Sequence, residues 1–366
     1  MKPWMKFKMK PRGYYFGAGP AMLPEEILRE AQQDLLNWDG QGVSILEIGH
    51  RTEAFMGLMK DTEERARNIL DIPDDYAVLF LGGSARSLFG TIPLNILQEN
   101  EKVAYIVTGT WSKMAFSEGR KLLKDSAYIL GSSESLQFTD IPDSFEPIQP
   151  LTRFVYFCPN ETIHGVRLQA PKELEDIPWV ADMTSCLFSE PIDIKRYGLI
   201  FAGAQKNIAN AGMTLVIVRK DWLENPPAHV LPTMMDLRVH LAHESLYATP
   251  PTFNCYLANL MMKWIEKQGG LQALNTINQQ KAKILYDFLD NSNHYKAMVA
   301  HQARSIMNVC FTTGDEHKDA KLLEKADKNG LYGLKGHKVL GGLRASLYNA
   351  MPLAGVETLI SFLKNQ

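Results

Sequence analysis

The sequence has little that would mark a disulfide-rich, metal-binding, membrane-spanning or nucleic-acid-binding protein. Its 366 residues contain only four cysteines, which lie far apart and form no CxxC pair, so neither a disulfide framework nor a zinc site is expected. No apolar run approaches the roughly 20 residues that a membrane helix needs. With 39 basic and 41 acidic side chains, nothing attracts the chain generally to nucleic acid or membranes. We therefore expect no metal ion, no nucleic-acid partner and no membrane association.

The phosphate-binding fingerprints of nucleotide-binding proteins are also missing. Neither GxGxxG nor GxxxxGK[ST] occurs, which disfavours a nucleotide-binding α/β protein, the alternative from another functional class. Residues 1–15 are basic but lack the apolar stretch of a secretion signal. We interpret them as a short N-terminal arm and expect a cytoplasmic protein.

Short apolar runs alternate with amphipathic segments between about residues 76 and 220. This pattern predicts an α/β fold with a mostly parallel central sheet, covered by helices on both faces. The expected strands are 76–81, 102–109, 126–130, 153–157, 179–183, 198–203 and 213–220. After Pro250 and Pro251 the pattern changes to two long helices, 252–268 and 271–291, followed by mixed strands and helices. We expect a large domain over 16–251 and a smaller α+β domain over 252–366.

Candidate chemical groups follow the ends of these strands, where ligands bind in open α/β sheets. Small residues at 82–85 would let backbone N–H groups approach an anion at the start of a helix. Trp111 could stack on a flat ring, Asp182 ends a strand, and Lys206 follows another. Taken one at a time, each feature has a structural explanation. The small residues suit a tight turn and Trp111 a place in the core, while Asp182 could cap a helix and Lys206 could be solvated. Together they supply the anion site, aromatic, acid and amine that pyridoxal phosphate requires.

Several longer motifs carry a resemblance to a known family. They are GPAMLPEEIL (19–28), EIGHRTEAF (47–55), CPNETIHG (158–165), GLIFAGAQKNI (198–208), TPPTF (249–253) and LKGHKVLGGLRASLYNAMPL (334–353). From about Gly17 onward the chain resembles the phosphoserine aminotransferases, a family of class-V aminotransferases. The resemblance implies a fold-type-I, pyridoxal-phosphate-dependent transferase that works as a homodimer.

The resemblance also implies roles for individual residues. Lys206 would carry pyridoxal phosphate and move protons in catalysis, while Asp182 would face the ring nitrogen. The implied cofactor contacts are completed by Ala85, Arg86, Trp111, Thr162 and Gln205, with Ala248 and Thr249 at the dimer interface. Arg344 would bind the substrate α-carboxylate, for which a guanidinium is well suited. The distal acid of the substrate would meet His50 and Arg51 from the second subunit, near His337 and Lys338.

The implied reaction is reversible amino transfer between L-glutamate and 3-phosphohydroxypyruvate, which gives O-phospho-L-serine and 2-oxoglutarate in serine biosynthesis. A second expected substrate is 3-hydroxy-2-oxo-4-phosphooxybutanoate, in pyridoxine biosynthesis. The alternative is another fold-type-I enzyme, such as an alanine–glyoxylate aminotransferase or a cysteine desulfurase. This sequence departs from the family pattern at four positions, Ala18, Leu88, Ala248 and Lys338. None of these departures affects the lysine, the acid or the stacking ring.

Overall fold

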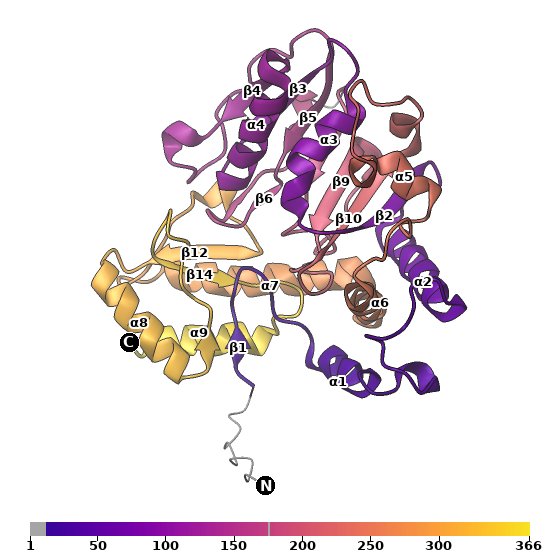
Figure 1. Cartoon of the computed structure of the whole chain (residues 1–366). Coiled ribbons are helices and arrows are strands. Elements are labelled where there is room, and N and C mark those ends of the chain that lie inside the picture. The colour runs from indigo at the N-terminus through magenta and orange to yellow at the C-terminus, as the bar shows by residue number, and fades with distance from the viewer. Residues whose placement is uncertain (1–11, 175) are drawn as a thin grey trace.

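The computed structural model describes residues 12–174 and 176–366. A seven-stranded sheet in the order β2-β10-β9-β8-β5-β3-β4 forms the centre of the larger part (Figure 1). Its strands are β2 (Tyr76–Gly82), β3 (Lys102–Val107), β4 (Ala127–Ser132), β5 (Thr152–Phe157), β8 (Trp179–Asp182), β9 (Tyr197–Gly203) and β10 (Met213–Arg219). Within this sheet only β10 runs antiparallel to its neighbours. The predicted α/β class, with a mostly parallel central sheet, is confirmed.

Helices bury both faces of this sheet. One face packs against α3 (Leu88–Ile96), α4 (Thr110–Leu123) and α5 (Leu237–Ala242). The other face packs against α1 (Glu25–Asp34), α2 (Glu53–Leu70) and α6 (Thr252–Lys267). In β2, Leu79 joins the first layer while Val78 and Phe80 join the second, because successive side chains of a strand point to opposite faces. Burial on both sides explains why the strands are apolar throughout rather than alternating.

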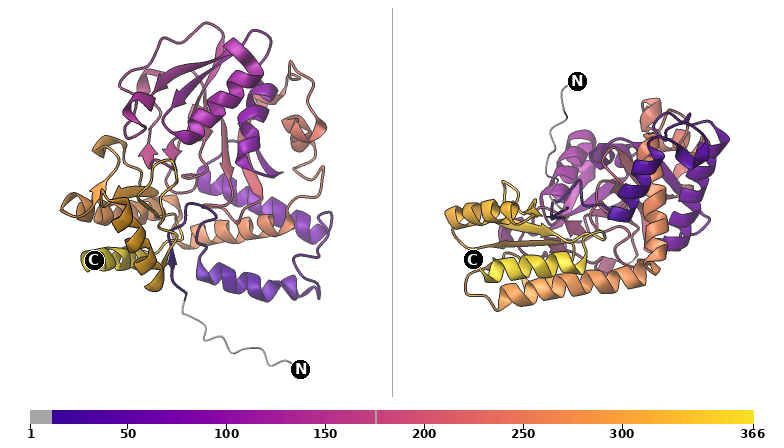
Figure 2. Two further views of the ribbon diagram at one scale, coloured as in Figure 1. Left: turned by 60° about the vertical axis from the view of Figure 1, so that its left-hand side comes forward. Right: turned by 90° about the horizontal axis from the view of Figure 1, so that it is seen from below.

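The smaller part has its own core around a three-stranded sheet, β11 (Lys296–Ala297), β12 (Asn308–Thr312) and β14 (Leu343–Ser346). Its helices are α7 (Gly270–Asp290), α8 (Glu316–Lys328) and α9 (Leu353–Lys364). Helix α7 connects the two parts, since Leu271 and Leu274 lie in the large core while Leu285 and Leu289 lie in the small one. The C-terminal part lies to one side of the large part in both further views (Figure 2).

The packing differs from the predicted domain boundaries at two places. Strand β1 (Tyr14–Tyr15) pairs in parallel with β13 (Leu331–Tyr332), and Phe16 is buried in the small core. The end of the predicted arm is therefore part of the C-terminal layer, while residues 1–11 lie outside the described residues. Helix α6, predicted to begin the small domain, lies in the large core because it packs along α2. The core changes within α7 rather than at residue 252.

Candidate active site

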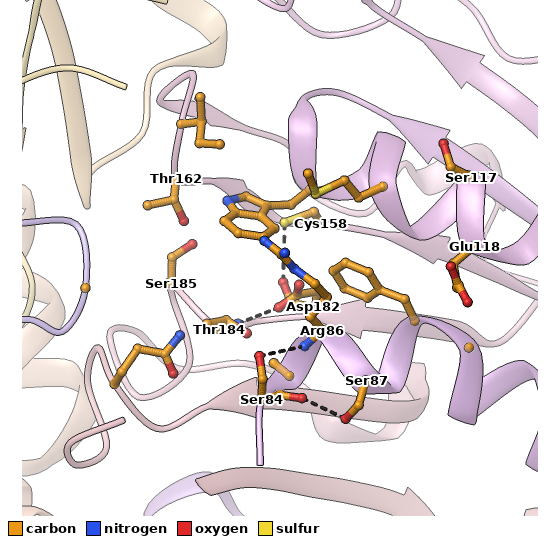
Figure 3. A pocket seen from close by; sticks show the side chains of 18 of the residues that line it. Ser84, Arg86, Ser87, Ser117, Glu118, Cys158, Thr162, Asp182, Thr184 and Ser185 are labelled. Atoms are coloured by element: carbon orange, nitrogen blue, oxygen red, sulfur yellow. Dashed lines mark hydrogen bonds between the residues drawn. The ribbon is translucent and has the colours of Figure 1, made fainter. Parts of the chain in front are cut away.

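The parallel strands end at one edge of the sheet, and a cavity of about 1300 Å³ lies there (Figure 3). Strands β2, β3, β8 and β9 all direct their carboxyl ends toward it, as the strand-end rule for open α/β sheets requires. The predicted site residues that line it are Ala85, Arg86, Trp111, Thr162, Asp182, Gln205, Lys206, His337 and Arg344. Residues far apart in the sequence are thus brought together around one cavity.

Lys206 and Asp182 are held by adjacent strands. Asp182 ends β8 opposite Phe201 of β9, and Lys206 lies in the turn that follows β9. The hydroxyl of Thr184 accepts a hydrogen bond from Gly203 N at 3.0 Å, which ties the two strand ends together. Lys206 is 7% exposed and donates from Nζ to Thr162 Oγ1 at 2.5 Å. The amine is thus fixed at the wall of the cavity by one neutral partner.

Asp182 is a deeply buried acid, 5% exposed. Its Oδ1 accepts a hydrogen bond from Thr184 N at 3.0 Å. Burial raises the pKa of this carboxyl, while the Thr184 hydrogen bonds and the charge of Lys206 oppose that rise. An acid placed in this way would be stabilised further by a cationic ring nitrogen.

Trp111 and the loop at residues 84–87 lie against each other. Trp111 belongs to the first turn of α4, and the guanidinium carbon of Arg86 lies 5.2 Å from its ring centroid. Ser84 Oγ accepts from Arg86 N at 3.3 Å, and Ser87 Oγ donates to Ser84 O at 2.7 Å (Figure 3). The chain continues from this turn directly into α3. The loop therefore places the cation of Arg86 beside a helix start, where it could bind a phosphate.

The opposite wall of the cavity comes from the small part. Arg344 lies on β14, is 9% exposed, and donates from Nη1 to Thr162 O at 3.2 Å. Burial lowers the pKa of His337, and the nearby charges of Arg344 and Lys338 lower it further. The guanidinium of Arg344 suits a carboxylate.

The residues present fit pyridoxal phosphate. Two donors in the cavity wall, Trp111 Nε1 and Arg344 Nε, are buried without a hydrogen-bond partner in the described part of the chain. The donor set also contains an amine, a buried acid and an anion loop, which match the aldehyde, ring nitrogen and phosphate of the cofactor. No three His, Cys, Asp or Glu side chains are grouped to hold a metal ion within 12–174 and 176–366. No helix in these ranges is long and apolar enough to cross a membrane.

Five predicted site residues do not line the cavity. They are His50, Arg51, Ala248, Thr249 and Lys338. His50 is half-buried and the other four are exposed. Two of these segments, 50–51 and 248–249, lie near each other, because α2 and α6 run in parallel and each segment shortly precedes its helix. The parallel direction follows from the contacts Asn259–Asp61 and Arg65–Glu266.

The cavity also contains polar residues that were not singled out from the sequence. Asn160, Thr184 and Ser185 line it. Asn160 Nδ2 donates to Ser185 Oγ and to Asn308 Oδ1, both at 2.8 Å, and so joins the large part to the small sheet. The strand-end rule would have found Thr184 and Ser185, which lie two and three residues after Asp182, the last residue of β8. The partner Asn308 is 148 residues from Asn160, so no local signal in the sequence indicates this contact.

Comparisons with known proteins agree with this geometry. The family model described as Aminotransferase class-V matches residues 13–359. The phosphoserine aminotransferase of Legionella pneumophila subsp. pneumophila is 54% identical over 356 residues, covering 97% of this chain and 98% of that protein. The crystal structure of pyridoxal-phosphate-bound phosphoserine aminotransferase from Trichomonas vaginalis has a TM-score of 0.90 at 37% identity, covering 96% and 100%.

A phosphoserine aminotransferase structure from Bacillus circulans subsp. alkalophilus gives a TM-score of 0.92 at 36% identity, covering 97% of this chain and 98% of that one. The match extends over both parts of the molecule, so the large sheet with its cavity and the small sheet belong to one architecture that these relatives share. The predicted fold type, enzyme class and cofactor are therefore confirmed. This chain belongs to the phosphoserine aminotransferase family of class-V aminotransferases, which are pyridoxal-phosphate-dependent enzymes of fold type I.

Proposed function

We propose that the enzyme transfers an amino group between L-glutamate and 3-phosphohydroxypyruvate, giving O-phospho-L-serine and 2-oxoglutarate. The cavity is the observation that supports this proposal, since Lys206, Asp182 and Arg344 all line it. The names of the relatives supply the substrate pair, and serine biosynthesis is the pathway in which the reaction would take place. We place the reaction in the cytoplasm, as expected from the sequence.

Pyridoxal phosphate, when bound, supplies an aldehyde that takes up amino groups and a ring that withdraws electrons. Lys206 would hold the cofactor and then move a proton between the substrate Cα and C4′ of the cofactor. Asp182 would keep the ring nitrogen protonated, because a buried carboxylate favours a neighbouring cation. Thr162 would orient the lysine amine through the hydrogen bond to Oγ1. Trp111 would cover the ring and exclude water from it.

Substrate binding would need cations at both ends of the substrate. Arg344 would bind the α-carboxylate through its planar pair of N–H donors. His50 and Arg51, together with His337 and Lys338, would bind the distal phosphate or carboxylate. In one chain His50 and Arg51 lie outside the cavity. The proposal therefore includes a homodimer in which a second subunit supplies them, together with Ala248 and Thr249 at the cofactor phosphate.

The alternative of a cysteine desulfurase is disfavoured by the cysteines. Such an enzyme needs an accessible, reactive thiol, whereas Cys310 is 2% exposed on β12 and donates to Ile163 O at 3.5 Å. Burial raises the pKa of its thiol to about 12. A thiol of this kind is inert. An alanine–glyoxylate aminotransferase would have no use for the predicted cations at the distal end of the substrate.

A visible absorption spectrum of the purified enzyme, taken before and after addition of O-phospho-L-serine, tests the proposal. We expect the visible band of lysine-bound cofactor to bleach as the amino group is transferred. Bleaching by L-alanine but not by O-phospho-L-serine or L-glutamate would contradict the proposed substrates. The amino-acid counterpart of 3-hydroxy-2-oxo-4-phosphooxybutanoate tests the pyridoxine-pathway substrate in the same way.

A further inference from the structure

Helix α4, which carries Trp111, begins without a capping side chain of its own. The residue before it is Gly109, and a carboxylate from elsewhere in the chain takes the role of the cap. Glu161 is fully buried, and its Oε1 accepts from Ser112 N at 2.8 Å and from Ser112 Oγ at 2.6 Å. Its Oε2 accepts from Trp111 N at 3.1 Å. The backbone of Trp111 is thus held by a residue 50 positions away.

Glu161 belongs to a hairpin that also contacts the catalytic lysine. Strand β6 (Asn160–Glu161) pairs with β7 (Val166–Arg167). The next residue, Thr162, accepts from Lys206 Nζ through its hydroxyl and from Arg344 Nη1 through its carbonyl. Two successive residues therefore join the stacking tryptophan, the amine and the substrate arginine. A shift of Glu161 would change the position of Trp111 relative to Lys206.

The space for this carboxylate depends on Gly109. A Cβ atom at that position would lie 2.4 Å from Glu161 Cδ and 2.5 Å from Oε2, closer than side-chain carbons approach. The backbone itself sets no such demand, because Gly109 has an extended conformation with φ of 176° that any residue can adopt. Glycine is needed here to admit the glutamate.

The charge of Glu161 is compensated by the start of the helix. The three hydrogen bonds come from the first turn of α4, where the helix dipole favours an anion. Burial raises the pKa of this carboxyl to about 6, the hydrogen bonds from Ser112 and Trp111 oppose that rise, and the nearby Asp182 adds to it. A buried acid without these donors would be costly to the fold, so the carboxylate and the first turn depend on each other.

We propose that Glu161 is a positioning residue of the aminotransferase, which fixes the indole of Trp111 over the cofactor ring and in register with Thr162 and Lys206. This inference rests on the proposed contact between Trp111 and the cofactor. Glu161 does not itself touch the reacting atoms. Its contribution is the geometry of the cofactor site.

The test uses the full-length apoenzyme titrated with pyridoxal phosphate. Glu161→Gln keeps the shape of the side chain but turns an N–H group toward donors that need an acceptor. We expect the dissociation constant for the cofactor to rise by about tenfold, the effect of losing one charge-assisted hydrogen bond. We also expect the cofactor to quench Trp111 fluorescence less, measured as the difference between each protein and its Trp111→Phe counterpart.

Asp319→Asn is the matched control, because Asp319 is another buried acid and accepts from Thr312 Oγ1 and from the N and Oγ1 of Thr313. It lies on α8, and it does not line the cavity. We expect this variant to lose stability without a change in cofactor affinity or in Trp111 quenching. A loss of affinity equal to that of Glu161→Gln would overturn the proposal, because it would reduce the effect to general destabilisation.

Gly109→Ala tests the same contact from the helix side, since its methyl group would displace the Glu161 carboxylate without changing the chemistry of any hydrogen-bonding side chain. We expect it to reproduce the affinity and fluorescence changes of Glu161→Gln. Wild-type affinity and quenching in both variants would overturn the proposal. If neither variant folds, amide hydrogen exchange in the wild-type holoenzyme decides, and rapid exchange at Trp111 and Ser112 overturns it.

Failure of the proposed function would look different. In that case O-phospho-L-serine would not bleach the visible band of the wild-type holoenzyme, whereas the differences in cofactor affinity and Trp111 quenching between the wild type and the variants would remain. Absence of those differences in a wild type that does transfer amino groups from O-phospho-L-serine would overturn the role of Glu161 alone.

Discussion

Two groups of predicted site residues differ in where the fold places them. The wall group, formed by Trp111, Thr162, Asp182, Lys206 and Arg344, lines one cavity within a single chain. The outer group, formed by His50, Arg51, Ala248, Thr249 and Lys338, lies outside that cavity; His50 is half-buried and the other four residues are exposed. The wall group contains the residues proposed for the chemistry of the cofactor, whereas the outer group contains cations proposed for the distal anion of the substrate. In a single chain the first proposed set is assembled around one cavity and the second is not.

The largest expected effect comes from changing Lys206 in the wall group. Lys206→Ala removes both the group that holds the cofactor and the group that moves the proton, so we expect transamination to fall by about 10³-fold or more. Steady-state kinetics with O-phospho-L-serine measures this. Borohydride reduction of the wild-type holoenzyme should label Lys206, as read by peptide mass spectrometry. A label on a different lysine would contradict the assignment.

Asp182→Asn should have the next largest effect. The amide cannot stabilise a protonated ring nitrogen, and loss of such an electrostatic partner lowers kcat by about 10²-fold or more. Asp319→Asn, the same change in a buried acid of the small part, should leave kcat close to the wild-type value. Equal losses in the two variants would mean that Asp182 acts only in stability.

Arg344→Lys should lower kcat/KM for amino-acid substrates by roughly 10- to 100-fold, because lysine keeps the charge but loses the paired donors. Arg304→Lys is the matched control. Arg304 makes a similar two-point contact, with Nη1 and Nη2 each 2.6 Å from an Asp290 oxygen, but it does not line the cavity. If the control loses as much kcat/KM as Arg344→Lys, the effect does not come from carboxylate binding.

The smallest expected effect is on stability and concerns a second buried lysine, Lys281, which does not line the cavity. It shows what burial alone does to a lysine. Lys281 is fully buried and donates to the carbonyls of Leu347, Tyr348 and Met351 at 2.8, 2.9 and 3.0 Å. Burial lowers its pKa from 10.5 to about 7. At pH values below 7 the folded and unfolded forms are both protonated, so the cost of burying the charge is fully present. As the pH rises above 7 the folded lysine loses its proton first, and stability should increase.

Chemical denaturation of the wild type and of Lys281→Met at several pH values measures this effect. Methionine has a similar length but no charge, so the wild type should gain unfolding free energy relative to the variant as the pH rises from 7 toward 10.5. Curves that stay parallel over this range would mean that the three carbonyls keep the ammonium charged.

Asp182, Lys206 and Trp111 lie at or just after the ends of β8, β9 and β3. Parallel strands bring their ends to one edge of a sheet, so the sequence indicates that these three residues lie close together. It could not predict contacts between distant segments that have no periodicity. The pairing of Tyr14 and Tyr15 with β13 is one such contact, and the cap that Glu161 places on α4 is another. The two prolines before helix α6 predict that it begins the small domain, whereas its burial against α2 depends on tertiary packing.

The proposal that the outer group completes the site of a second subunit is tested most directly by mixing two inactive variants, Lys206→Ala and Arg51→Ala. If Arg51 serves the site of the second subunit, a mixed dimer has one site with an intact lysine and an intact arginine from the partner. After verified subunit exchange of equal amounts, we expect about a quarter of the wild-type sites to be active. Activity that stays at the level of the separate variants, although exchange has been verified, would contradict the shared site.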